Sequence, residues 1–253
     1  MNKNIYCTLD TETFGGAVNP KGIYHLAGII HDKQGNIIAV FNYLISEHYE
    51  EIEKDSYAKK NFYKYLNMIN DGEITMISTE QEAINAVNEL CNFYNVKYMM
   101  AYNSGFDFCK TMCRQLIEER EFIDIYLMAL QTITHIKKYA RFCHENNLKS
   151  SSLSIYAYIT NNAKYSEEHT AMEDSKIEMQ IFIACEKCHK KYTKNLHAFD
   201  RTADGKKFPR WNEEERILML TKDLTENQKY WFNICVNNGS KVEDALKYVK
   251  RLR

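Results

Sequence analysis

Two acidic residues lie two positions apart near the start of the chain, at the end of a run that is typical of a β-strand. The first half of residues 5–16 suits an extended backbone, and two consecutive glycines end the run. Side chains alternate along a strand, so Asp10 and Glu12 leave it on the same face. Such a pair repels unless a cation lies between the carboxylates. It is therefore either a solvated strand end or half of a metal site.

A third acidic residue follows another predicted strand. Residues 78–82 (Ser-Thr-Glu-Gln-Glu) form a capping box that opens a helix, and the strand Lys97–Tyr102 comes after it. A helical crossover makes this strand parallel to the first. Asp107 then lies at a carboxyl end beside Asp10 and Glu12, where sites form in open α/β sheets.

The fourth acidic residue, Asp174, lies near the start of a helix that is predicted to run to about Lys191. Asp174 follows His169 by five residues. Four carboxylates without a thiolate or imidazole cluster suit hard cations such as Mg²⁺ or Mn²⁺. Two such ions about 3.5–4 Å apart clamp the oxygens of an in-line phosphoryl displacement. His169 could then take a proton from the attacking water. The alternatives are a surface helix residue for Asp174 and a polar helix-start residue for His169.

Together and in this order, three motifs resemble those of the DEDDh 3′→5′ exonucleases of the proofreading-subunit (DnaQ-like) and RNase T type. The motifs are Asp10-Thr11-Glu12-Thr13, then Asn103-Ser104-Gly105-Phe106-Asp107, then His169-Thr170-Ala171-Met172-Glu173-Asp174. A sister subclass has tyrosine four positions before the last acid. Thr170 takes that position here, which favours the histidine subclass. The resemblance extends from the first strand to about residue 191.

The resemblance implies a ribonuclease-H-like α/β fold. Its mixed five-stranded sheet has an antiparallel meander and two parallel strands, and helices flank it. The resemblance further implies two Mg²⁺ or Mn²⁺ ions held by Asp10, Glu12, Asp107 and Asp174. It gives His169 the role of general base, with release of nucleoside 5′-monophosphates from a 3′ end.

Substrate contacts are also carried over by the resemblance. Thr11, Thr13 and Phe14 would lie near the terminal nucleotide, where an aromatic ring can stack on a base, and Asn103 would help orient that end. For Phe14 a place in the core is the alternative. Thr170 stands where the family often has a basic residue, which weakens the expected phosphate contact.

The remaining elements follow from local patterns. The runs 22–30 and 36–45, separated by a polar gap with Gly35, predict a hairpin that continues the meander. Residues 46–72 predict one tyrosine-rich helix of unassigned role. A strand at 122–123 leads to Asp124 and a helix over 125–143, and we expect Asp124 to cap that helix rather than bind metal.

The whole chain of 253 residues suits one large domain with an appendage, 1–193 and 194–253. From Glu186 onward there are 16 lysines and arginines against 10 acidic residues, whereas the preceding part has 17 against 24. An acidic body with a basic extension fits a carboxylate site with a polyanion contact, and also an ordinary solvated helical tail. With neither an export signal nor a membrane-spanning apolar run, we expect a cytoplasmic location.

Cysteines and tail aromatics leave alternatives open. The eight cysteines are expected to be reduced thiols. Cys185 and Cys188 with His189 or His197 could bind zinc, but they fall within a predicted helix and lack a second pair. The tail aromatics either stack nucleobases or form a small core; they are Trp211, Tyr230, Trp231 and Phe232.

We therefore expect a 3′→5′ exonuclease that acts on single-stranded ends, with DNA ahead of RNA as substrate. The competing hypothesis is a non-catalytic nucleic-acid-binding or polymerase-tethered module, whose basic extension docks a replication or repair protein. Nucleotide release in the presence of Mn²⁺ discriminates between the two. The sequence leaves the roles of 46–72 and 194–253 open.

Overall fold

The computed structural model of the chain describes residues 4–15, 20–149, 151–167, 169–192, 200–201, 221, 224–237 and 242–250. The chain divides into two compact units, Met1–Pro209 and Arg210–Arg253. Both units contain buried apolar clusters. The expected boundary between residues 193 and 194 lies outside the described residues and stays a prediction.

The first unit is built on a sheet with strand order β4-β3-β2-β1-β5-β6-β7. At its centre, β1 (Ile5–Phe14) pairs antiparallel with β2 (Gly22–Asp32) and parallel with β5 (Val96–Ala101). β3 (Ile37–Ile45) continues the antiparallel meander, and β6 (Glu121–Asp124) runs parallel to β5. These five strands have the order and directions of a ribonuclease-H-like sheet, which confirms the predicted fold class.

Two short strands extend this sheet beyond the five that the sequence predicts. β4 (Thr75–Ile77) pairs parallel with β3, and β7 (Asp200–Arg201) pairs antiparallel with β6. Strands of three and two residues are too short to carry a readable alternation of apolar and polar side chains. Their pairing depends on neighbours that are distant in the sequence.

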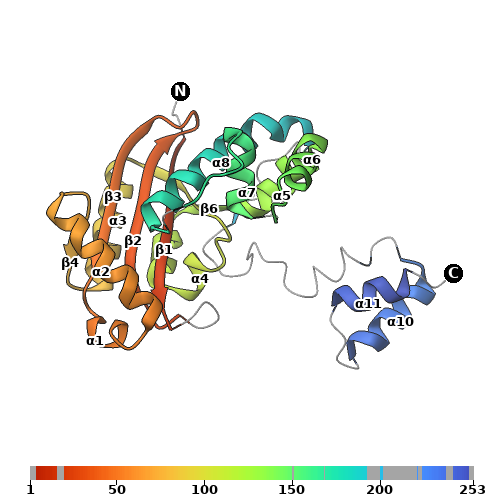
Figure 1. Cartoon of the computed structure of the whole chain (residues 1–253), viewed down its shortest axis with the longest axis horizontal. Helices are drawn as coiled ribbons and strands as arrows, with labels where there is room; N and C mark the ends of the chain where they lie inside the picture. Colours follow the sequence, from red (N-terminus) through yellow and green to blue (C-terminus); the bar gives the residue numbers. More distant parts are fainter. Residues whose placement is uncertain are drawn as a thin grey trace. The chain divides into compact units, whose positions relative to one another are not determined.

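Helices cover both faces of the sheet (Figure 1). On one face, α3 (Glu80–Phe93) and the 3₁₀-helix η1 (Met112–Ile117) pack on odd-numbered residues of β1 such as Leu9. On the other face, α8 (Ala171–Tyr192) packs on even-numbered residues such as Tyr6. The alternation of β1 thus directs Asp10 and Glu12 toward the α8 face. No helix in the described ranges is both long and apolar enough to cross a bilayer.

The tyrosine-rich segment forms two helices instead of the expected one. α1 (Tyr49–Ile52) is a single turn, and α2 (Ser56–Asn70) begins after Asp55. The Asp55 carboxylate accepts the backbone N–H groups of Tyr57 and Ala58, each at 3.1 Å. An N-cap of this kind starts a new helix, because it satisfies donors that have no partner within the helix.

The predicted helix over 125–143 is likewise divided. α5 (Ile125–Leu130), the 3₁₀-turn η2 (Ile133–His135) and α6 (Lys137–Glu145) occupy it. Three β-branched residues in succession, 132–134, lower the helix propensity at the break. The start of this segment agrees with expectation: the Asp124 carboxylate accepts the Leu127 N–H at 3.1 Å, so Asp124 is an N-cap.

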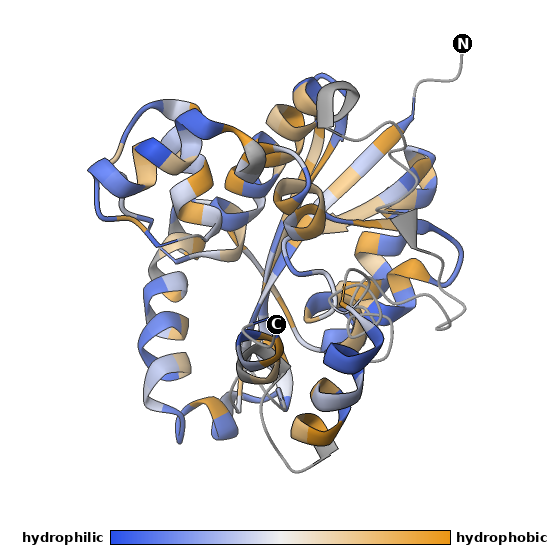
Figure 2. Cartoon of the chain, turned by 90° about the vertical axis from the view of Figure 1, so that its right-hand side faces the viewer, coloured by the Kyte–Doolittle hydropathy of each residue, from blue (hydrophilic) through white to orange (hydrophobic). Residues whose placement is uncertain are grey.

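Two further short helices complete the first unit. α4 (Asp107–Lys110) follows β5, and α7 (Ser152–Thr160) begins after the N-cap Ser151. The hydropathy colouring shows apolar residues concentrated in the strands, whereas the helices alternate between apolar and polar residues (Figure 2). This is the distribution expected for a sheet buried between layers of amphipathic helices.

The second unit contains α10 (Glu226–Asn237) and α11 (Val242–Val249). Thr225 and Gln228 form the predicted capping box, with N···O distances of 3.0 and 3.3 Å, whereas Ser240 of the other box lies outside the described residues. Phe232 is buried in a small core, whereas Tyr230 and Trp231 are exposed. Trp211 also falls outside the described part of the chain.

Candidate active site

Asp10 and Glu12 occupy regular positions on β1 just before its regularity ends. They lie opposite Ala27 and His25 of β2, and the register shifts between Glu12 and Thr13. Up to that point the alternation is unbroken, so both carboxylates leave the same face of the sheet, as the sequence predicts. A bulge beside functional residues is common, because it redirects the chain at the strand end.

α8 brings Asp174 to the same place. One carboxylate oxygen each from Asp10, Glu12 and Asp174 lies within 4.8 Å of the other two. Small residues permit this approach: Ala171 and Ser175 are fully buried, and the Ser175 hydroxyl lies 3.1 Å from the Ala27 carbonyl oxygen of β2. The structure therefore brings together three of the four predicted ligands, although β1 and α8 are far apart in the sequence.

Asp107 lies beside these three acids but is not within the 4.8 Å group. It is the first residue of α4, directly after the turn that follows β5, and it is buried. The Thr11 hydroxyl donates to Asp107 Oδ1 at 2.7 Å. Thr11, predicted to lie near a terminal nucleotide, thus uses its side chain to fix an acid at the start of α4.

The other predicted substrate contacts are placed as follows. Phe14 is only 3% exposed and belongs to an apolar cluster, which is the alternative that the sequence left open. Thr13 is half-buried, and Asn103 is half-buried with a left-handed backbone (φ 65°). The Phe106 N–H donates to the Asn103 carbonyl oxygen at 2.8 Å and so closes the turn before Asp107.

Glu178 is a fifth carboxylate that the motifs do not include. It is 4% exposed, and its Oε2 has no hydrogen-bond partner. Its charge raises the pKa of Asp10, and the charges of Asp107 and Asp174 raise the pKa of Glu178. A sequence signal existed: residues four apart on a helix lie on the same face, so Glu178 follows Asp174 toward the sheet.

Burial and repulsion from neighbouring carboxylates raise the pKa values of all five acids, and for Glu12 and Asp107 the repelling charges are Glu167 and Asp124. Burial is the largest cause for each; the pKa rises to about 7 for Glu12 and for Asp107 and to about 8 for Asp174. The pKa values of Asp10 and Glu178 lie well above their ordinary values. All five can be ionised together only with compensating positive charge. An all-oxygen donor set with one orphaned buried oxygen fits hard divalent cations.

His169 has an unusual backbone conformation and pairs with Glu167, whose charge acts on Glu12 and Asp174. Its φ is +53°, and the other non-glycine residues with positive φ among those described are all asparagines. Such a conformation costs roughly 1–3 kcal/mol and persists where the surroundings impose it. The ring Nδ1 lies 2.6 Å from Glu167 Oε1, and the His169 side chain is 61% exposed. Glu167 is therefore an orienting carboxylate that the motifs do not include.

Thr170, at the position where the family often has a basic residue, serves as a helix cap. It is buried, and its hydroxyl oxygen accepts the Glu173 N–H at 3.1 Å. This contact satisfies a free donor in the first turn of α8. The threonine therefore helps to start the helix that carries Asp174.

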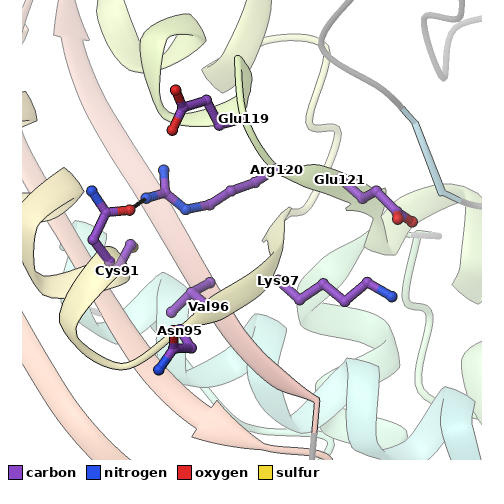
Figure 3. A pocket seen from close by; sticks show the side chains of 8 residues that line it. Cys91, Asn95, Val96, Lys97, Glu119, Arg120 and Glu121 are labelled. Atoms are coloured by element: carbon purple, nitrogen blue, oxygen red, sulfur yellow. Dashed lines mark hydrogen bonds between the residues drawn. The ribbon is translucent and has the colours of Figure 1, made fainter.

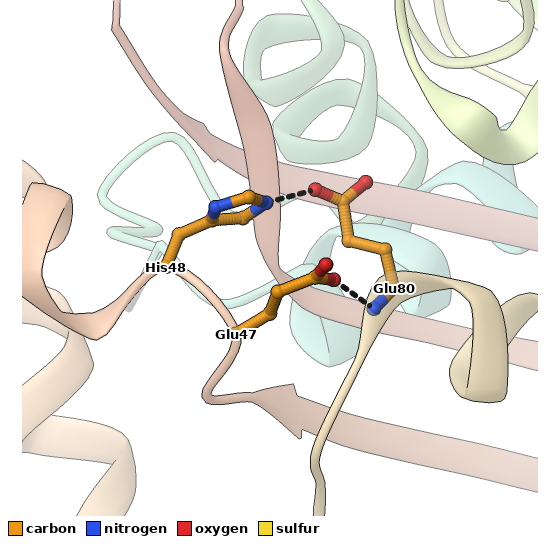
Figure 4. Close-up of side chains that lie close together, drawn as sticks. All are labelled: Glu47, His48 and Glu80. Atoms are coloured by element: carbon orange, nitrogen blue, oxygen red, sulfur yellow. Dashed lines mark hydrogen bonds and ion pairs between the residues drawn. The ribbon is translucent and has the colours of Figure 1, made fainter.

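A second group with metal-ligand chemistry lies at the start of α3 (Figure 4). Suitable atoms of Glu47, His48 and Glu80 lie within 4.8 Å of one another. Glu80 Oε1 lies 2.9 Å from His48 Nε2 and accepts the Ile23 N–H at 3.1 Å, while Glu47 accepts the Glu80 N–H at 2.8 Å. These contacts fasten α3 to β2 and to the end of β3. We interpret the group as structural.

Arg120 lines a cavity of about 390 Å³ at the opposite ends of β5 and β6 (Figure 3). Its guanidinium donates to Asn88 Oδ1 at 2.7 Å, to the Leu116 carbonyl oxygen at 3.0 Å and to Asn92. A cation near the carboxyl end of α3 is favoured by the helix dipole. We therefore interpret Arg120 as a cap for the end of α3. The cavity that it lines is at the other end of the strands from the acids.

The two cysteines considered for zinc lie on α8. Cys185 is buried and Cys188 is half-buried, and both are free thiols. Burial raises the pKa of Cys185 to about 12, which opposes the thiolate that zinc requires. His197 and the side chain of His189 fall outside the described part of the chain, so the zinc hypothesis stays untested.

Comparison with known proteins gives a likeness in structure and none in sequence. No protein-family model matches the chain, and no curated protein matches it. A solved structure described as "crystal structure of full-length 3'-exonuclease" is similar with a TM-score of 0.48 and 12% sequence identity, over 74% of this chain and 83% of that chain. The strand order and strand directions of its own sheet make this chain a ribonuclease-H-like α/β protein.

Proposed function

We propose that this protein is a metal-dependent 3′→5′ exonuclease that hydrolyses single-stranded nucleic acid to nucleoside 5′-monophosphates, with DNA ahead of RNA. The observation that carries the proposal is the meeting of Asp10, Glu12 and Asp174 within 4.8 Å. These are residues of the first and third exonuclease-like motifs. The middle motif supplies Asp107, whose charge acts on Asp10.

Two Mg²⁺ or Mn²⁺ ions would be held by the four acids that the family resemblance assigns as ligands: Asp10, Glu12, Asp107 and Asp174. Bound there, the ions would supply positive charge to the attacking and leaving oxygens of an in-line displacement. Thr11 holds the Asp107 carboxylate through its hydroxyl. Tyr24 contributes a weaker contact, with its hydroxyl 3.4 Å from Glu12 Oε2.

His169 would be the general base. With Nδ1 paired to Glu167, the imidazole keeps Nε2 as the nitrogen that accepts a proton. The exposure of the ring suits contact with water at the rim of the site. A carboxylate that orients the base and stabilises its protonated form is a recurring arrangement in hydrolytic enzymes.

The 3′-terminal nucleotide of the substrate would contact α2. Tyr57 is 58% exposed, and the charges of Glu12 and Asp174 raise its pKa in addition to burial. An exposed ring beside the acids can stack on a terminal base, a role that the buried Phe14 cannot fill. The choice of DNA over RNA stays an expectation, because discrimination rests on contacts to the 2′-hydroxyl.

The test is incubation of the purified protein with Mn²⁺ and 5′-labelled single-stranded DNA and RNA oligomers. We expect a ladder that shortens from the 3′ end, release of 5′-monophosphates, and complete loss of both with EDTA. Asp10→Asn and Asp174→Asn should each lower the rate by at least about a thousandfold, because each removes a charge that holds the ions.

Glu89→Gln is the matched control, because Glu89 is exposed on α3 and lies on the opposite side of the sheet. It should leave the rate unchanged. Folding of every variant is checked by circular dichroism. If the wild-type protein binds the oligomers and releases no nucleotide, the exonuclease proposal is wrong and the binding-module hypothesis is favoured.

A further inference from the structure

The tyrosine-rich helix α2 lies outside the three motifs, yet it reaches the loop that precedes α8. Tyr65 of α2 is fully buried, and its hydroxyl donates to the His169 carbonyl oxygen at 2.8 Å. The two residues are 104 positions apart. The contact therefore joins a segment of unassigned role directly to the predicted general base.

The Tyr65 ring is itself fixed on several sides. Its centroid lies 4.4 Å from the ring centroid of His25 and 6.2 Å from that of Tyr24. His25 Nε2 lies 2.7 Å from Asn42 Oδ1, which anchors the imidazole to β3. A ring enclosed in this way has little freedom to move, so its hydroxyl is a fixed point from which the loop can be held.

The carbonyl that Tyr65 binds belongs to the residue with the left-handed backbone. At φ +53° the peptide after His169 is turned out of the ordinary conformation of an L-residue, and Thr170 at once begins to cap α8. Glu167 pairs with the ring, and Tyr65 with the backbone. The two contacts together determine where the imidazole lies relative to Asp174.

We infer that Tyr65 is a positioning residue for His169: its hydroxyl holds the loop in the conformation that places the imidazole for proton transfer. The inference rests on the proposed function and extends it to a helix that the motifs do not contain. Tyr65 touches neither substrate nor ions in this role, and it acts only through His169.

A purely structural role is the competing interpretation, because a buried tyrosine hydroxyl usually finds some partner. The two differ in what happens when His169 is absent. A positioning residue has no effect on the rate once the residue it positions is gone, whereas a general loss of stability acts in either background.

The experiment is a double-mutant cycle with Tyr65→Phe and His169→Ala, followed by single-turnover kinetics on a 5′-labelled DNA oligomer with Mn²⁺. Tyr65→Phe keeps the ring and removes only the hydroxyl. We expect kcat to fall roughly ten- to hundredfold, the range for a misplaced catalytic group, with KM within about twofold of wild type. In the His169→Ala background the same change should lower the rate less than about twofold.

Tyr63→Phe is the control, since Tyr63 lies on the same helix and its hydroxyl bonds to that of Tyr49 at 2.7 Å. It should leave kcat and KM unchanged. Equal rate losses from Tyr65→Phe in both backgrounds, or an unchanged kcat, would overturn the inference. If wild type is inactive, the proposed function itself fails.

A second measurement does not depend on activity. The backbone amide order parameter of His169, measured by ¹⁵N relaxation, should fall from the rigid range near 0.85 to below about 0.6 in Tyr65→Phe. In Tyr63→Phe it should stay in the rigid range. An unchanged order parameter in Tyr65→Phe would show that the hydroxyl does not hold the loop.

Discussion

At the scale of single residues, Glu178 has an environment that is hard to satisfy without a cation. It is buried with one oxygen unpartnered, and its neighbours include Asp10, Asp107 and Asp174. The backbone N–H of Tyr102 bonds to it and lowers its pKa, but burial and the other acids outweigh that contact. A neutral side chain of the same shape should suit this position better when no ion is bound.

Glu178→Gln should therefore weaken ion binding and stabilise the ion-free protein. We expect the Mn²⁺ dissociation constant from calorimetry to rise roughly ten- to hundredfold, the range for residues that support metal ligands. The melting temperature in EDTA should rise, because the repulsion at the site falls. Glu89→Gln should change neither quantity. Unchanged Mn²⁺ affinity in Glu178→Gln would assign Glu178 a purely structural role.

The sequence predicted that four acids meet, of which the structure brings three within 4.8 Å, but it did not predict what holds them. Asp10, Glu12 and Asp174 could be identified because their signals can be read from the sequence alone. These signals are the alternation of side chains along a strand, the start of a helix and the order of the motifs. Tyr65 could not be assigned in that way, because its role depends on a contact between segments 104 positions apart. Glu178 had a helical-spacing signal, but it lies outside the three motifs. Phe14 was ambiguous because an aromatic side chain at the end of a strand can either pack in a core or stack on a base.

At the scale of elements, the approach of α8 to β2 sets the position of Asp174. Ala171 and Ser175 at the start of α8 are fully buried, and the Ser175 hydroxyl bonds to the Ala27 carbonyl oxygen. A larger side chain at position 171 cannot be accommodated without moving the helix, because protein interiors are close-packed.

Ala171→Leu should consequently lower both stability and activity. We expect a loss of about 1–3 kcal/mol in the free energy of unfolding from overpacking. Movement of Asp174 should lower the rate by about a hundredfold. Ala140→Leu, at an exposed position of α6, is the control and should leave both unchanged. Urea unfolding and the oligomer assay measure the two effects; full activity in Ala171→Leu would contradict this account of how Asp174 is placed.

Elements with local signals were predictable, and those without were not. Thr79 and Glu82 form the expected capping box of α3, and Asp124 caps α5. The break between α5 and α6 and the separation of α1 from α2 were missed, since apolar periodicity continues across both. β4 and β7 pair with strands that are distant in the sequence, so no pattern within their few residues reveals them.

At the scale of the whole molecule, the raised carboxyl pKa values make stability depend on pH. Asp174 titrates at about 8 and Glu12 and Asp107 at about 7 in the folded state, against about 4 when unfolded. The folded form thus holds protons that the unfolded chain has released. This contribution to stability is fully present below about pH 4 and is lost as the pH rises to about 8.

Thermal unfolding in EDTA should therefore show a melting temperature that falls from pH 5 to pH 8. Mg²⁺ should restore stability most strongly at pH 8, because ions and protons compete for the same oxygens. Asp174→Asn should flatten both trends, whereas Glu89→Gln should follow the wild type. A melting temperature that rises with pH in EDTA would contradict the assigned direction of the shifts.

The placement of Asp10 on the first strand and Asp174 on α8 has a consequence for synthesis on the ribosome. Domains fold as the nascent chain emerges, at about 5–20 residues per second, and α8 is among the last elements of its unit to appear. Until it docks, the early carboxylates lack their partner. A nascent polypeptide without α8 therefore has only part of the group of acids that we propose to hold the ions.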